Sequence, residues 1–173
     1  IRVMEYNILV EYPGWGSGGN IPPEVEIRKE IVSSVINGYK PDVLCMCEFF
    51  ENWRNQLPPL LDPAYRFVAI DRTDGYSNRT TLVYNSDTLT LIKGGYDDSV
   101  DLIENNINKR VVMWAVFEVK ESRERFMVLG SHFDSEANAE SNRTKQAQIM
   151  VSLMKRLQAE YGVSTAILTG DFN

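Results

Sequence analysis

The run Val43–Cys47 (VLCMC) constrains the fold of this chain more than any other stretch. All five residues are apolar, so a strand formed there must be buried on both faces, as in the centre of a sheet that is covered on both sides. Further strands are expected at residues 2–9, 65–70, 80–84, 89–93, 110–119, 125–133 and 165–169, with helices at residues 22–37 and 139–161 and surface loops at residues 10–23, 71–79 and 94–109. We therefore predict an α+β domain in which helices cover β-sheets.

Each expected helix has an apolar stripe that indicates its buried side. In the first helix the stripe is Ile27, Ile31 and Val35, and Gly38 is expected to end the helix. In the longer helix the stripe consists of Ala147, Met150, Met154 and Leu157.

Composition narrows the possible functions. The 173 residues suffice for one domain, and a net charge of −6 argues against a general basic face for a long nucleic-acid duplex. That charge leaves open a local basic groove or a small phosphorylated substrate. No apolar run has the length of a membrane span, and residues 1–3 lack signal-peptide architecture, so the compartment stays open. Cys45 and Cys47 lie two residues apart on one expected strand. Because this is a poor geometry for a disulfide, we expect both cysteines to be reduced and packed.

Four of the expected strands end in polar residues. They are Asn7, Glu48, His132 with Asp134, and Asp171 with Asn173. Each has an ordinary explanation, because Gly-Asp-Phe-Asn is common turn chemistry, a lone histidine is more often structural, and a strand-end glutamate is usually solvated. If the strand ends converge, their oxygen ligands suit a hard cation such as Mg²⁺. A metal with an oriented water is the chemistry of phosphate-ester hydrolysis.

The order and surroundings of these residues resemble the successive motifs of the endonuclease/exonuclease/phosphatase superfamily. The matching segments are residues 3–8 (VMEYNI), 41–48 (PDVLCMCE), 130–134 (GSHFD) and 170–173 (GDFN), and residues 143–147 (RTKQA) resemble a further segment of bacterial members. The resemblance covers residues 1–173 in the expected order. It implies a four-layer α/β/β/α sandwich of two mixed sheets, with the active site at one edge.

The resemblance also implies hydrolysis of a phosphodiester or phosphomonoester with Mg²⁺ or Mn²⁺. It assigns Glu48 as the main metal ligand and places Asn7 close to the metal and the phosphate. His132 would contact the phosphate or assist the leaving group, and Asp171 would orient or deprotonate the attacking water. Asn173 would hydrogen-bond to the phosphate oxygens. Electrostatics agrees, since Glu48 and Asp171 would repel an anion unless a divalent cation reversed the local charge.

The sequence departs from the family pattern at its carboxy-terminal side. Family members carry a further histidine-containing motif after the Gly-Asp-Phe-Asn segment, whereas the sequence stops at Asn173. We therefore expect residues 1–173 to be the amino-terminal portion of a longer domain that is inactive, or nearly so, by itself. A missing carboxy-terminal segment or a second chain would then complete the fold and cover an exposed sheet edge.

Three charged residues have two interpretations each. Glu5 stands where a small hydroxyl or aromatic residue is more common, and it is either a salt-bridge partner or an additional acidic group near the metal. Arg143 lies on the inner stripe of the long helix, so we expect a carboxylate partner such as Asp134, the alternative being a side chain that extends to solvent. Arg110 either reaches a phosphate or forms a structural ion pair.

Two functions from different classes remain. The first is a metal-dependent phosphoesterase whose substrate is a nucleic acid, a lipid headgroup or a sugar phosphate. The second is a binding or regulatory module that keeps the fold without catalysis. The aromatic, glycine-rich loop around Tyr12, Trp15 and Gly16, together with the region of Trp53, is a candidate rim for a lipid headgroup or sugar phosphate.

Overall fold

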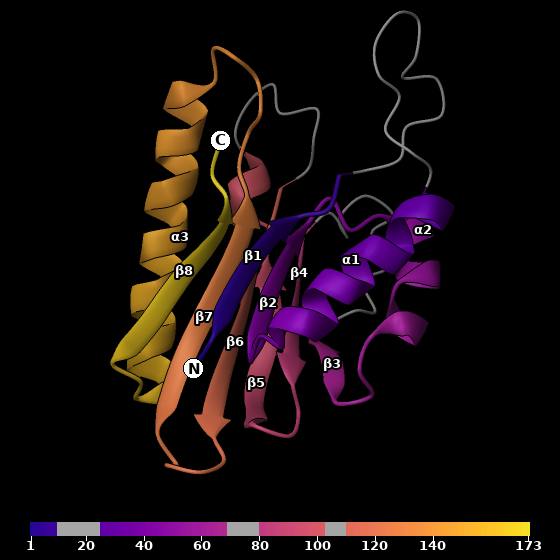
Figure 1. Cartoon of the computed structure of the whole chain (residues 1–173). Coiled ribbons are helices and arrows are strands. Elements are labelled where there is room, and N and C mark those ends of the chain that lie inside the picture. Colours follow the sequence, from indigo (N-terminus) through magenta and orange to yellow (C-terminus); the bar gives the residue numbers. More distant parts are fainter. Residues whose placement is uncertain (10–24, 69–79, 103–109) are drawn as a thin grey trace, which may run out of the picture.

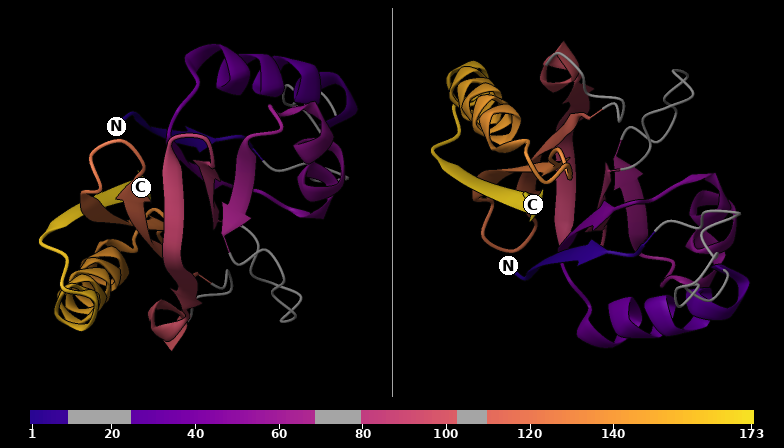
Figure 2. Two further views of the ribbon diagram at one scale, coloured as in Figure 1. Left: turned by 90° about the horizontal axis from the view of Figure 1, so that it is seen from below. Right: turned by 90° about the horizontal axis from the view of Figure 1, so that it is seen from above.

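The computed structural model describes residues 1–9, 25–68, 80–102 and 110–173 of this protein. Within these residues two four-stranded sheets pack face to face, and α-helices cover their outer sides (Figures 1 and 2). The arrangement confirms the predicted α+β sandwich with layers in the order α/β/β/α. The expected loops 10–23 and 71–79, including Tyr12, Trp15 and Gly16, and the expected helix start at Pro22 and Pro23 lie outside the described residues.

The first sheet has the strand order β1-β2-β4-β3. Its strands are β1 (Val3–Asn7), β2 (Val43–Cys47), β4 (Thr80–Asn85) and β3 (Tyr65–Val68). β1 and β2 are parallel, and the other two pairs are antiparallel, so the sheet is mixed. Helices α1 (Val25–Tyr39) and α2 (Glu51–Gln56) and a 3-10 turn η1 (Pro58–Leu60) lie on its outer face.

The second sheet has the strand order β5-β6-β7-β8. Its strands are β5 (Leu89–Asp97), β6 (Val112–Val119), β7 (Arg125–His132) and β8 (Thr165–Asp171). β7 and β8 are parallel and the other pairs antiparallel, so this sheet is mixed as well. Helix α3 (Glu140–Tyr161) covers its outer face, with the 3-10 turn η2 (Ser99–Leu102) beside it.

β2 lies where its sequence predicts, in the interior between two layers. Val43, Cys45 and Cys47 face the second sheet, whereas Leu44 and Met46 face α1. All five residues are fully buried, and both cysteines are free thiols, as expected. β2 is thus the strand around which both apolar cores are built.

The predicted stripe of α1 is wrong. Ile27 and Ile31 are 62% and 63% exposed, and the helix instead buries Val25, Val32 and Ile36. Both sets recur at helical spacing, so periodicity alone does not distinguish them, and packing on Leu44 and Met46 selects the second. The helix also continues through Gly38, because Lys40 is the residue with the left-handed backbone, at a φ of 47°.

Two further predictions need correction. On α3 the fully buried residue near the start is Gln146 rather than its neighbour Ala147, which is exposed. Residues 94–97 belong to strand β5 instead of a surface loop. Gly94 and Gly95 make this extension possible because a β-carbon there would meet Val68 at 2.5 Å and Trp114 at 3.2 Å.

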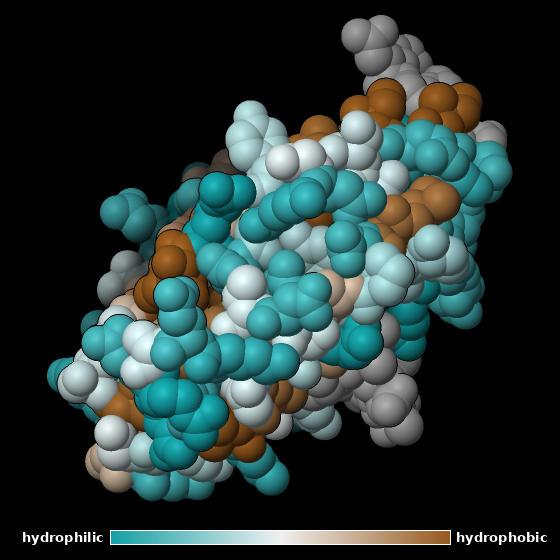
Figure 3. Space-filling model, turned by 60° about the horizontal axis from the view of Figure 1, so that its bottom comes forward, coloured by the Kyte–Doolittle hydropathy of each residue, from teal (hydrophilic) through white to brown (hydrophobic). Residues whose placement is uncertain are grey.

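One face of the molecule is mainly polar. On the face drawn in Figure 3, hydrophilic residues predominate and hydrophobic ones form separate patches. Among the described helices, none has the length and apolar character needed to cross a membrane.

Candidate active site

The carboxyl ends of β1, β2, β7 and β8 lie together at one end of the sandwich (Figure 1). Asn7 forms the link between the two sheets. Its side-chain nitrogen donates to Glu48 Oε1 at 3.0 Å and to Asp171 Oδ2 at 2.9 Å. His132 completes the group, with Nε2 at 3.8 Å from Asp171 Oδ2. Four of the five predicted site residues therefore gather at one point.

Glu48 follows β2 directly and turns the chain sharply. Its φ of 63° lies in the left-handed region, which non-glycine residues seldom adopt. The turn is closed by a hydrogen bond of 2.9 Å from the Phe50 amide to the Glu48 carbonyl. Such backbone strain concentrates at functional sites, and here it places a half-buried carboxylate beside Asn7.

Gly170 sets the position of Asp171. Its φ is 129°, and a β-carbon on it would lie 1.9 Å from the Ser131 carbonyl oxygen. Only glycine permits this close approach of β7 and β8. The register that results pairs Asp171 with His132. A residue without a side chain thus fixes the spacing of two predicted catalytic groups.

The electrostatics of Asp171 favour its ionised form. Burial raises the pKa of this carboxyl, but hydrogen bonds from the Asn7 side chain and the Asn173 backbone, together with electrostatic interactions with His132 and Arg110, lower the pKa by more than burial raises it. The net result is a pKa below the ordinary value of an aspartate. Asp171 is therefore a carboxylate at neutral pH, able to accept hydrogen bonds from a water molecule.

Asn173 lies next to this group without joining the Asn7 bridge. Its backbone amide donates to Asp171 Oδ1 at 3.1 Å, and its side-chain nitrogen donates to the Phe133 carbonyl at 3.2 Å. The residue is exposed, with a φ of 52°. Its side-chain oxygen and nitrogen could turn toward a ligand only if the bond to Phe133 were exchanged.

Glu5 and Arg110 belong to the surroundings of the site. Within the described residues Glu5 forms no ion pair, so the salt-bridge interpretation finds no support. Burial, followed by the negative charge of Asp171, raises the pKa of Glu5. Arg110 is 4% exposed, donates to Ser135 Oγ at 3.2 Å and adds positive charge near Asp171. From the sequence, a structural ion pair was at least as plausible for Arg110 as a contact with a phosphate, and the structure places Arg110 near the site.

The segment between β7 and α3 is held by polar contacts to the start of the helix. The amide of Asp134 donates to Gln146 Oε1 at 2.9 Å, and Asn142 donates to Asp134 Oδ2 at 3.0 Å. Arg143 binds the backbone carbonyls of Asp134 and Glu136 at 3.1 and 2.9 Å. Arg143 thus contacts the predicted residue, Asp134, but through its backbone carbonyl rather than its carboxylate. These contacts fix the chain just after His132.

The donor set suits a hard divalent cation. Two carboxylates, Glu48 and Asp171, surround one amide nitrogen, and Mg²⁺ commonly binds through one or two carboxylates while keeping several waters. In the described parts of the chain, no group of three or more carboxylate, histidine or cysteine side chains forms a ready metal cage.

The fold has close counterparts among solved structures, although no family model and no curated protein matches the sequence significantly. A mannosyl-6-phosphatase of Bacteroides thetaiotaomicron, Bt3783, aligns with a TM-score of 0.81 and 20% identity over 100% of this chain. An endonuclease/exonuclease/phosphatase protein from Bacteroides vulgatus aligns with a TM-score of 0.76 and 24% identity over 99% of it. The chain has the fold of the endonuclease/exonuclease/phosphatase proteins.

A third structure with this fold is D. rerio TDP2 in complex with a single-stranded DNA product. It aligns with a TM-score of 0.73 and 18% identity over 100% of this chain. The chain spans 65%, 64% and 60% of the length of these three structures, respectively. The resemblance expected from the motifs is confirmed at the level of the fold.

Proposed function

We propose that residues 1–173 form the amino-terminal portion of a metal-dependent phosphoesterase domain of the endonuclease/exonuclease/phosphatase family. The observation that carries this proposal is the Asn7 amide between Glu48 and Asp171, which holds two carboxylates from opposite sheets at one point. Two carboxylates held this close could share a divalent cation and an oriented water, which together carry out phosphate-ester hydrolysis. The fold of the three matched structures supports the same conclusion.

Each residue of the group has a role in the proposed reaction. Glu48, with Asn7, would hold Mg²⁺ or Mn²⁺. A bound divalent cation would supply charge neutralisation for the phosphate and lower the pKa of a water. Asp171, ionised at neutral pH, would orient or deprotonate the attacking water. His132 would contact the phosphate or assist the leaving group, and Asn173 would donate to a phosphate oxygen.

The substrate class is proposed as a phosphate ester, with three candidates. The matched structures include a mannosyl-6-phosphatase and a protein bound to a DNA product, which favour a sugar phosphate and a nucleic acid, respectively. A lipid headgroup is the third. The net charge of −6 favours a small substrate over a long duplex.

Metal binding is testable on residues 1–173 directly. Calorimetric titration with Mn²⁺ should show binding that Glu48→Gln weakens by about tenfold or more. Glu51→Gln, an exposed glutamate three residues away on α2, is the matched control and should bind as the unmodified chain does. Equal binding by all three proteins would refute the assignment of Glu48.

We propose that residues 1–173 alone are inactive, or nearly so, until a carboxy-terminal segment or a second chain completes the fold. Catalysis is therefore tested on a longer chain. The complete protein should release p-nitrophenol from bis-p-nitrophenyl phosphate only with Mg²⁺ or Mn²⁺, and Glu48→Ala should abolish release. Mannose 6-phosphate and single-stranded DNA would then be compared as substrates. Metal binding without any hydrolysis would favour the binding module instead.

A further inference from the structure

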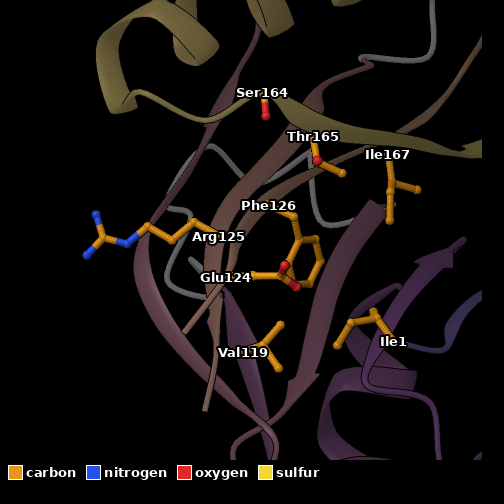
Figure 4. Close-up of a pocket in the computed structure, with 8 residues that line it drawn as sticks. All are labelled: Ile1, Val119, Glu124, Arg125, Phe126, Ser164, Thr165 and Ile167. Atoms are coloured by element: carbon orange, nitrogen blue, oxygen red, sulfur yellow. The ribbon is translucent and has the colours of Figure 1, made fainter. Parts of the chain in front are cut away.

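The two ends of the sandwich differ in how β1 and the second sheet meet. At the start of β1 a hollow of about 380 Å³ opens between Ile1 and strands β6, β7 and β8. Apolar groups such as Phe126 and Ile167 line it together with the carboxylate of Glu124 (Figure 4). At the other end the Asn7 amide binds carboxylates that follow or end strands of both sheets. Because β1 pairs only with β2, contacts from outside the sheet are expected to hold this amide in place.

Leu9 fixes which side of the Asn7 amide faces the carboxylates. The backbone amide of Leu9 donates to Asn7 Oδ1 at 3.0 Å. Since an oxygen accepts this bond, the side-chain nitrogen with its two hydrogens faces Glu48 and Asp171. An amide rotated by half a turn would direct its oxygen at two carboxylates, which have no hydrogen to donate when ionised. The hydrogen bond from Leu9 therefore sets the orientation on which the Asn7 bridge depends.

Leu9 reaches this position through an uncommon backbone conformation. Its φ of 58° lies in the left-handed region, which is sterically unfavourable for a residue with a β-carbon. The preceding Ile8 is buried, and its amide still donates to the Cys47 carbonyl at 3.1 Å, so the chain leaves the sheet directly after Ile8. The Leu9 side chain is exposed and adds little packing. Contacts to the backbone must therefore hold this turn.

Two helices supply those contacts. Arg28 of α1 donates from one nitrogen, Nη1, to the carbonyls of Ile8 at 2.7 Å and Leu9 at 2.9 Å. Trp53 of α2 donates from Nε1 to the Leu9 carbonyl at 3.0 Å. The two side chains also hold each other, because the guanidinium carbon of Arg28 lies 4.9 Å from the centre of the fully buried Trp53 ring. Both helices thus bind the two successive carbonyls that follow Asn7.

We propose that Arg28 and Trp53 are positioning residues of the candidate active site, which act on it through Leu9 and the Asn7 amide. By binding the carbonyls they keep Leu9 in its left-handed conformation, and Leu9 then keeps the Asn7 nitrogen on the two carboxylates. Residues that orient a metal site in this way commonly affect its affinity as strongly as a ligand does. The effect on metal binding rests on the proposed function, whereas the effect on Asn7 needs no metal.

Hydrogen exchange of the side-chain amides, followed by nuclear magnetic resonance on residues 1–173 without metal, tests the effect on Asn7. Arg28→Lys keeps the charge but loses the planar group that binds both carbonyls and stacks on the ring, so the Asn7 side-chain hydrogens should exchange about tenfold faster. Trp53→Phe keeps an aromatic ring but loses its N–H, and should act in the same direction. Asn37, also on α1, is the internal control, because its side-chain nitrogen donates to the Leu60 carbonyl at 2.8 Å and its exchange should not change.

Val32→Ala separates positioning from general stability. Val32 is buried on the same helix and packs in the core, and its side chain has no group that could bind the carbonyls. This variant should loosen the packing of α1 and leave the exchange of Asn7 as in the unmodified chain. Circular dichroism would verify that all variants fold. If Arg28→Lys left the exchange of Asn7 unchanged, or accelerated Asn7 and Asn37 equally, Arg28 would only link α1 to the sheet and the proposal would be wrong.

Calorimetric titration with Mn²⁺ tests the consequence for the site. Arg28→Lys should weaken binding about tenfold, the size typical of residues that orient metal ligands. Val32→Ala should bind as the unmodified chain does. Unchanged or tighter binding by Arg28→Lys would overturn the proposal. Failure of the unmodified chain to bind Mn²⁺ would instead count against the proposed function, and the exchange of Asn7 would still decide whether Arg28 positions it.

Discussion

The side-chain amide of Asn7 donates a hydrogen bond of 2.9 Å to Asp171 Oδ2, a group 164 positions later in the sequence and in the other sheet. The same nitrogen lies 3.0 Å from Glu48 Oε1. One amide of β1 therefore binds both the residue that follows β2 and the last residue of β8. The geometry of the proposed site depends on how the two sheets pack, and its electrostatics can be measured through Asp171.

Stability should depend on pH through Asp171. Burial raises the pKa of Asp171. The opposite effect of Asn7, Asn173, His132 and Arg110 is larger, so the folded-state pKa lies below the unfolded value of about 3.9. The stabilising contribution is thus fully present above the unfolded pKa and is lost as the pH falls through the folded pKa. Urea unfolding at a series of acidic pH values should show a shallower loss of stability in Asp171→Asn. Identical acid profiles would contradict this.

Removal of the Glu5 charge should stabilise the protein at neutral pH. Burial and the nearby Asp171 raise the pKa of Glu5, so its charged form is disfavoured in the folded state. Because Glu5 is largely exposed, Glu5→Gln should add only about 0.3–0.5 kcal/mol at neutral pH. The gain should vanish below its unfolded pKa, where Glu5 is protonated in both states. Glu121→Gln, in the exposed β6–β7 turn, is the control and should change little.

Gln146 should be important for stability although its side chain carries no charge. It is fully buried, and its Oε1 accepts from the Asp134 amide at 2.9 Å. Gln146→Met keeps the volume but leaves that amide unpaired, which should cost about 1–2 kcal/mol in urea unfolding. Gln148→Met, on the exposed side of the same helix, should stay within about 0.5 kcal/mol of the unmodified chain. A similar effect of both changes would refute the role of Gln146.

Gly130 and Cys45 should be coupled. A β-carbon on Gly130 would lie 2.6 Å from Cys45 Sγ, so Gly130→Ala should destabilise the fold by about 1–3 kcal/mol. Cys45→Ala removes the sulfur, and the double variant should therefore recover about 1 kcal/mol relative to additivity. Gly38→Ala has no atom within 4 Å of the new carbon and should be neutral or stabilising. Additive effects in the double-mutant cycle would exclude this contact as the cause.

Much of the fold follows from local patterns. The continuous apolar run of β2, the alternation in its neighbours and the length of α3 predict buried strands and a covering helix, because these periodicities reflect local backbone geometry. The same logic fails for α1, where Ile27 and Ile31 form as regular a stripe as Val25, Val32 and Ile36. Only the surface that the helix meets distinguishes the two.

The sequence by itself determined which residue types stand at the strand ends, and their order resembles that of a known family. Only the tertiary structure decided that Asn7 and Glu48 of one sheet meet His132 and Asp171 of the other. It also decided that Asn173 turns to Phe133 and that Arg143 binds carbonyls rather than a carboxylate. The physical reason is that side-chain periodicity describes one element at a time, whereas convergence depends on how two sheets pack and on the close approach at Gly170.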